Sequence, residues 1–128
     1  MKPRYIVALS ISAGIAIGAA PVQTLHAQAK PPGFVVVEID ASDPDAYAKE
    51  FLPSAGKALA AGGIKFLARG GKTEAIEGAP PAKRVVIGRF ESLEKAMATY
   101  TGPAYMEARK IGDKYAKFRI WAVEGAAQ

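Results

Sequence analysis

The residue types that could do chemistry gather first around a double glycine, Gly70-Gly71. Arg69 precedes this pair, and Glu74 and Glu77 follow it. Glycine reaches positive φ at no steric cost, so a bend here would expose backbone donors, and the neighbouring arginine could hold a carboxylate or phosphate bidentately. The alternative is structural: the arginine pairs with one of the glutamates across the bend and fixes its shape. The near cancellation of charge favours this second interpretation.

A second set of candidates is aromatic. Tyr47, Tyr100 and Tyr105 lie in segments with helical spacing, and their phenols could orient a small ligand in an apolar cleft between helices and a sheet. The alternative is core packing with the hydroxyls at the rim, the usual role of aromatic residues at such spacing. Arg84 and Arg89 share one predicted strand. Whichever points into the cleft is the best anchor for an anion, and strand parity alone does not decide between them.

The first 29 residues have the composition of a secretory signal peptide. Lys2 and Arg4 precede an uncharged apolar run over residues 6–20, and Ala27-Gln28-Ala29 offers a small-x-small cleavage site. A membrane anchor is the alternative, but the run is shorter than the ~20 residues that a spanning helix needs. We therefore expect export to the periplasm or the medium, with no stable membrane anchor after cleavage and one domain over residues 30–128.

Charge and composition exclude several functions. The chain has 17 basic and 12 acidic residues, and removal of Lys2 and Arg4 lowers the net charge from +5 to +3. The remaining charges are interspersed, so we expect no nucleic-acid partner. There is no cysteine, and the one histidine, His26, lies before the expected cleavage site. This excludes Ser-His-Asp and Cys-His catalysis and the usual zinc and copper sites, so we expect no cofactor and no metal.

These candidates must be positioned by elements in the order β-α-β-β-α-β. The third and fourth of them form a hairpin whose first arm is interrupted by the double glycine and whose turn is Gly78-Ala79-Pro80-Pro81. The order predicts an α+β fold of the ferredoxin-like kind, an antiparallel sheet with helices on one face. We expect strands over residues 34–39, 64–68 with 73–77, 83–90 and 118–123, and helices over residues 44–61, 93–100 and 103–114.

The helix ends carry recognisable signals. Asp43 is a candidate N-cap with Pro44 at the first helical position, and Ser92 is the candidate N-cap of the second helix. Pro103 restarts that helix after a glycine. Pro53 lies inside the first helix, where we expect a kink or a break, because proline removes a backbone donor and clashes with the preceding turn.

The strands are apolar on both faces. In the first strand, Val35, Val37 and Ile39 can face the helices while Phe34 and Val36 face away. In the last strand, the same alternation opposes Phe118 and Ile120 to Trp121 and Val123. Such a sheet would leave a large apolar surface in water, which usually marks an interface. We expect a homodimer closed sheet to sheet.

With these residues identified, the segment from Phe34 to Gly125 resembles the bacterial family catalogued as domain of unknown function 1330, a group of small dimeric α+β-barrel proteins. The resemblance implies the fold and dimerisation and no activity. It rests on these motifs: Gly62-Gly63, Arg69-Gly70-Gly71, Glu74, Glu77-Gly78, Arg84-Val85-Val86-Ile87 with Phe90, Ser92-x-Glu94-x-Ala96 and Gly102-Pro103-x-Tyr105.

Three functional hypotheses remain open. The first is a homodimeric binding protein that holds a small molecule in the helix-sheet cleft. The second, by analogy of fold, is a cofactor-independent monooxygenase or isomerase with Glu38 or Glu77 as base, which requires a buried carboxylate of raised pKa. The third is a structural or stress-accessory protein without a ligand, which a completely filled cleft would favour. No residue is assigned a catalytic role at this stage.

Overall fold

The computed structural model describes residues 30–127, so the predicted signal peptide lies outside the described residues. The predicted β-α-β-β-α-β order is confirmed, with each helical arm built from more than one segment. The elements are β1 (Gly33–Ala41), α2 (Pro44–Ala46), η1 (Tyr47–Phe51), α3 (Leu52–Ala61), β2 (Lys65–Arg69), β3 (Arg84–Phe90), α4 (Leu93–Thr101), α5 (Pro103–Gly112) and β4 (Ala116–Glu124).

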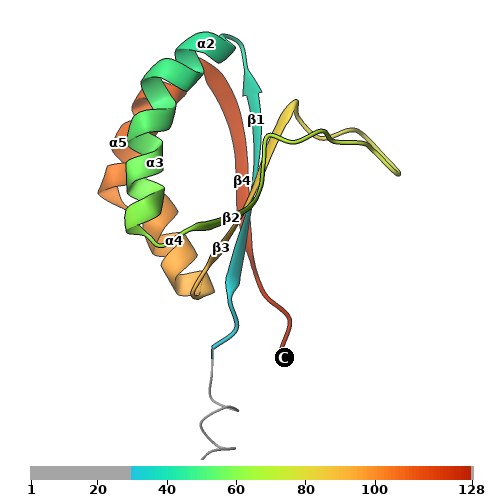
Figure 1. The fold of residues 1–128 in the computed structure, drawn as a ribbon, viewed down its shortest axis with the longest axis vertical. Coiled ribbons are helices and arrows are strands. Elements are labelled where there is room, and N and C mark those ends of the chain that lie inside the picture. Colours follow the sequence, from blue (N-terminus) through green and yellow to red (C-terminus); the bar gives the residue numbers. More distant parts are fainter. Residues whose placement is uncertain (1–29, 128) are drawn as a thin grey trace, which may run out of the picture. The chain divides into compact units, whose positions relative to one another are not determined.

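The strands form one antiparallel sheet in the order β2-β3-β1-β4, and the helices cover one of its faces (Figure 1). This is the predicted ferredoxin-like arrangement. The predicted alternation in β1 is also confirmed. Val35, Val37 and Ile39 are buried against the helices, at 1%, 4% and 3% exposure, whereas Phe34 and Val36 are half-buried on the other face.

We expected a kink or a break at Pro53, and the first helical arm does not end there. The chain instead widens into one π-helical turn, η1, where the N–H of Leu52 donates to the carbonyl of Tyr47. Pro53 then lies in the first turn of α3, where a missing N–H costs no helical hydrogen bond. The wide turn buries Tyr47 and Phe51 side by side, with ring centroids 5.2 Å apart.

The predicted helix caps are confirmed. Asp43 Oδ1 accepts a hydrogen bond from the Ala46 N–H at 3.1 Å, and Ser92 Oγ accepts one from the Lys95 N–H at 3.1 Å. In the second helical arm, extended backbone at Gly102 separates α4 from α5. This corner brings residues at the end of α4 close to the first turn of α5.

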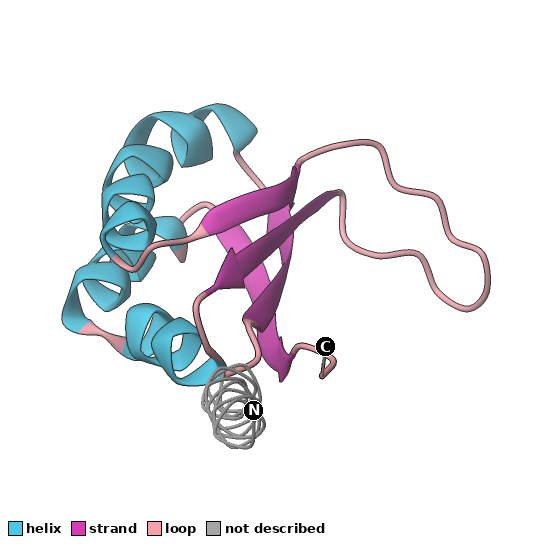
Figure 2. Ribbon diagram, turned by 60° about the horizontal axis from the view of Figure 1, so that its bottom comes forward, coloured by secondary structure: helices cyan, strands magenta, loops and turns pink. Residues whose placement is uncertain are grey.

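The hairpin differs from the prediction in its outer half. Residues 73–77 do not continue the strand, and the segment 70–83 is an almost wholly exposed loop that projects beyond the sheet (Figure 2). Pro80 and Pro81, on the side of the loop that leads into β3, lack the backbone N–H donors that pairing between strands needs. The irregularity predicted at the glycines lies earlier, between Phe66 and Ala68, while Gly70 with φ 74° begins the loop.

Candidate functional site

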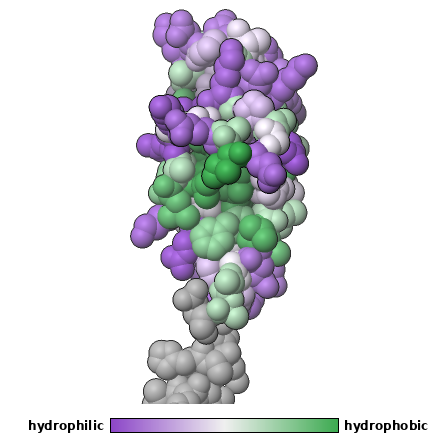
Figure 3. Space-filling view, turned by 90° about the vertical axis from the view of Figure 1, so that its right-hand side faces the viewer, coloured by the Kyte–Doolittle hydropathy of each residue, from purple (hydrophilic) through white to green (hydrophobic). Residues whose placement is uncertain are grey.

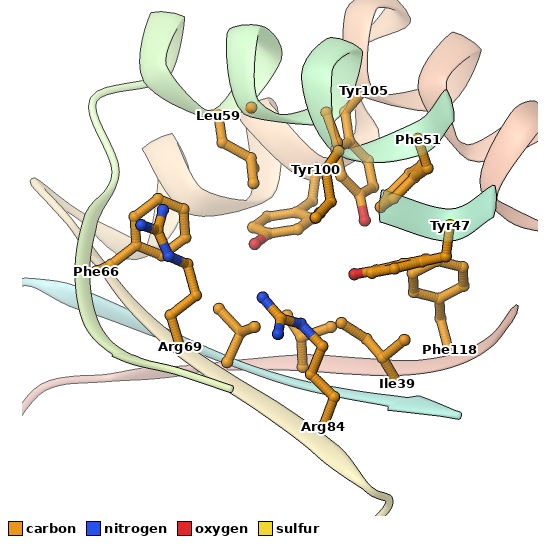
Figure 4. Close-up of a pocket in the computed structure, with 15 residues that line it drawn as sticks. Ile39, Tyr47, Phe51, Leu59, Phe66, Arg69, Arg84, Tyr100, Tyr105 and Phe118 are labelled. Carbon is orange, nitrogen blue, oxygen red and sulfur yellow. The ribbon is translucent and has the colours of Figure 1, made fainter. Parts of the chain in front are cut away.

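A cavity of about 480 Å³ lies between the helices and the inner face of the sheet (Figure 4). Its volume falls within the ~300–1,000 Å³ that is usual for small-molecule sites. The lining is apolar and aromatic apart from a few polar groups. Five of the seven predicted site residues line it: Tyr47, Arg69, Arg84, Tyr100 and Tyr105.

The three tyrosines reach the cavity from three different helical segments. Tyr47 comes from η1, Tyr100 from α4 and Tyr105 from α5, and the last two rings pack edge to face at 4.7 Å. Figure 4 shows their hydroxyls pointing into the cavity, toward the side from which the arginines enter. The helical corner at Gly102 therefore serves the site directly, because it brings two phenols together.

Burial keeps these phenols protonated to a higher pH than an exposed tyrosine. It raises the pKa of Tyr100 well above the ordinary value, and raises the pKa of Tyr105 to about 12 against the opposing charge and hydrogen bond of Arg109. Burial also raises the pKa of Tyr47, although the charge and a hydrogen bond of Arg84 act in the opposite direction. At neutral pH all three are uncharged hydrogen-bond donors, and none is a base.

The two arginines enter the cavity from the neighbouring strands β2 and β3. Arg69 is the register partner of Val86, and Arg84 precedes Val86 by two residues. Both side chains therefore extend from the face of the sheet that the helices cover. Arg89 has the opposite parity and is exposed. Arg84 is thus the residue of the predicted pair that points into the cavity.

Local packing fixes both guanidinium groups. That of Arg69 lies over the ring of Phe66, 4.5 Å from its centroid. A Cβ on Gly70 would collide with Arg84 Nη1, so the absent side chain leaves the space that this guanidinium occupies. The Nε of Arg84 is buried, and it has no hydrogen-bond partner among the described residues.

The predicted carboxylates are not part of this cavity. Glu74 and Glu77 lie in the exposed loop, where Glu74 pairs with Lys72 at 3.3 Å. Within residues 30–127, no ion pair joins Arg69 to either glutamate, so the predicted pairing across the bend is not formed. The described cavity lining contains neither aspartate nor glutamate.

Glu38, the other carboxylate considered as a base, faces the opposite side of the sheet. Its side chain accepts a hydrogen bond from the Ala82 N–H at 2.9 Å and pairs with Arg119 Nη1 at 3.1 Å. It therefore anchors the end of the exposed loop to β1. A reaction in the helix-sheet cavity has no access to this group.

Sequence reasoning did not name two aromatic walls of the cavity. Phe51 and Phe118 pack with ring centroids 5.3 Å apart, and both rings contact Tyr47. Their signals were present: Phe51 follows Tyr47 by four residues, and Phe118 has the inward parity of β4. Periodicity thus placed them in the core, but it carries no information on whether a core is filled.

The fold and the cavity define a class, the ferredoxin-like α+β proteins with a helix-covered antiparallel sheet. More particularly, the chain belongs to the family described as Domain of unknown function (DUF1330), whose model matches residues 32–126. No curated protein matches the chain. None of the helices between residues 30 and 127 is long and apolar enough to cross a bilayer.

Solved structures of similar fold come from several bacteria. One is a protein of unknown function from Rhodopseudomonas palustris (TM-score 0.57, 18% identity, 77% of this chain and 85% of that one). Another is SnoaB, a cofactor-independent oxygenase from Streptomyces nogalater (TM-score 0.52, 11% identity, 77% and 95%). A third is a dimeric ferredoxin-like protein of unknown function from Thermobifida fusca (TM-score 0.50, 18% identity, 77% and 92%). At these identities the similarity shows the fold alone.

Proposed function

We propose that this protein binds a small, largely apolar molecule between its helices and its sheet, as an exported homodimer. The observation that carries the proposal is the open volume of about 480 Å³ inside a domain of this size. The space is a half-open cleft lined mainly by aliphatic and aromatic side chains, and its volume is that of a small-molecule site. A structural protein without a ligand would be expected to fill it.

The hypothesis of a cofactor-independent oxygenase or isomerase is less well supported by the site. SnoaB shares the fold with this chain, and fold does not determine activity. Among the described residues the cavity has no carboxylate to act as a base, and its phenols are protonated at neutral pH. The groups present can hold and orient a molecule, which is the chemistry of binding.

The homodimer rests on the outer face of the sheet, which no helix of residues 30–127 covers (Figures 1 and 3). Figure 3 shows apolar side chains gathered in the middle of this face with polar ones around them. By register, Val36 lies between Ile87 and Trp121, and Phe34 lies beside Val123. A contiguous apolar row of this kind is expected to be covered by a second copy of the chain.

Export rests on the composition of residues 1–29. The experiment is an intact-mass measurement on protein recovered from the periplasm of an expressing bacterium. A chain beginning close to Lys30 is the expected result, whereas a chain that keeps residues 1–29 and stays in the cytoplasm would contradict export.

Binding is tested by native mass spectrometry of the same periplasmic protein, under conditions that keep small molecules attached. We expect additional mass on each subunit. Gly56 lines the cavity and has open space where a Cβ would stand, so Gly56→Phe should occupy the site and remove the added mass. Ala61→Phe is the matched control, because Ala61 is exposed on the same helix, lies on a different face from Gly56 and is not part of the cavity lining. Added mass that survives Gly56→Phe would place the ligand elsewhere.

A further inference from the structure

We infer that the ligand is an organic acid, an apolar and preferably aromatic body with one carboxylate held between Arg69 and Arg84. This inference rests on the proposed function, since it assigns a chemical class to the molecule in the same cavity. Three features of the described residues support it. They are the positive charge of two arginines that no carboxylate balances, a buried donor without an acceptor, and an apolar, aromatic lining for the body of the ligand.

The first feature is the charge of the lining. Arg69 and Arg84 are diagonal neighbours on the same face of the hairpin, and no aspartate or glutamate of the described lining lies with them. An adjoining cavity of about 240 Å³ shares Tyr47 and Arg84 with the first and adds Lys83. Arg69 and Arg84 carry like charges beside the apolar surface of one cleft, and one bound anion would offset the repulsion between them.

The second feature is the donor geometry of Arg84. Its Nε is buried, and no group among the described residues accepts from it. A guanidinium group presents a planar fork that matches the two oxygens of a carboxylate. Gly70 leaves the room that this group needs, and the stacking on Phe66 holds the second guanidinium nearby. The bend at the double glycine therefore serves the anion site by its lack of side chains.

The third feature is the remainder of the lining. The tyrosine hydroxyls are neutral donors, and the other walls are aliphatic or aromatic, as with Phe51 and Phe118. An aromatic body can pack against such walls edge to face. A phosphate would bring a dianionic tetrahedral group into the same space with more acceptors to satisfy, at a greater desolvation cost. A carboxylate is therefore the anion that this lining favours.

The test compares three probes that share a naphthalene body by isothermal titration calorimetry: 2-naphthoate, the neutral 2-naphthalenemethanol and 2-naphthyl phosphate. We expect 2-naphthoate to bind at least tenfold more tightly than the alcohol, because hydrogen bonds to a charged group are worth roughly twice neutral ones. Arg84→Gln should remove this preference while the affinity for the alcohol is kept. Arg89→Gln is the matched control, since Arg89 lies on the same strand and faces away.

Arg69→Gln keeps the test decisive if Arg84→Gln fails to fold, because Arg69 is exposed and its replacement should leave the fold intact. Equal binding of naphthoate and alcohol to the native protein would overturn the inference and leave the proposed function standing. Tighter binding of the phosphate would overturn the choice of carboxylate. Failure of every probe, together with no added mass on the periplasmic protein, would overturn the proposed function as well.

Discussion

Both faces of the sheet carry an arginine beside aromatic residues, but the two arginines differ in their partners. On the outer face, Arg119 pairs with Glu38 at 3.1 Å and its guanidinium lies 4.7 Å from the centroid of Trp121. On the inner face, Arg84 has a buried Nε without a partner in the described chain. The outer face carries a row of apolar side chains and an arginine that is paired with a carboxylate, whereas the inner face lines a half-open cleft whose two arginines have no carboxylate in the described lining. A second protein surface suits the first, and a small anion suits the second.

The largest expected effect concerns the outer face. Val36 lies at the centre of the apolar row, so Val36→Asp would bury a carboxylate without a partner in the proposed dimer. We expect the dimer dissociation constant to rise at least a hundredfold, which sedimentation velocity across a concentration series measures. Met106→Asp is the control, because Met106 is 51% exposed on the helical layer. A dimer unaffected by Val36→Asp would show that the sheet face is not the interface.

The tyrosines give the inner side a signature in pH. Because burial raises the pKa of Tyr105 from 10.0 to about 12, the folded state binds this proton more tightly than the unfolded state does. Its contribution to stability is therefore complete below pH 10 and is lost between pH 10 and 12, on the order of 2 kcal/mol. Urea unfolding across this range checks the slope. Tyr105→Phe should make the slope shallower, with the remainder coming from Tyr100 and Tyr47, whose pKa values are also raised. An unchanged slope in that variant would assign the titration to other groups.

The double glycine allows a comparison within one bend. Gly70 has φ 74° and lies against Arg84, whereas Gly71 has no positive φ and open space at its Cβ position. Gly70→Ala should lower the unfolding free energy by roughly 1–2 kcal/mol and displace the guanidinium, because a left-handed backbone disfavours alanine. Gly71→Ala should change little. If urea unfolding shows equal losses of unfolding free energy in the two variants, then the space beside Arg84 makes no particular demand for glycine at position 70.

Local signals in the sequence predicted much of the fold. The caps at Asp43 and Ser92 and the two-sided pattern of β1 were predictable because each depends on a residue and its near neighbours. The form of the irregularity near Pro53 was not predicted, since one π-helical turn before it moves the proline into a first turn, and propensity does not predict that adjustment.

The candidate site was predictable in its residue types and not in its grouping. Tyr47, Arg69 and Arg84 were named from the sequence, yet the glutamates beside them along the chain lie in the exposed loop. Proximity in sequence suggested that Arg69 would pair with Glu74, whereas the structure turns the arginine inward over Phe66. The cavity itself depends on how side chains from eight elements pack around it, and no local sequence pattern predicts that.

The smallest expected effect tests the balance of charge on the outer face. Glu38→Gln keeps an oxygen for the Ala82 N–H and removes only the ion pair with Arg119, whose side chain is 76% exposed. We expect a loss below about 1 kcal/mol, because water solvates the released guanidinium. A double-mutant cycle with Arg119→Gln, followed by urea unfolding, measures the coupling. A coupling well above this value would mean that an arginine beside apolar strand residues needs an anion even in solvent. A small coupling energy would confine the need for an anion to Arg84, whose Nε is buried away from water.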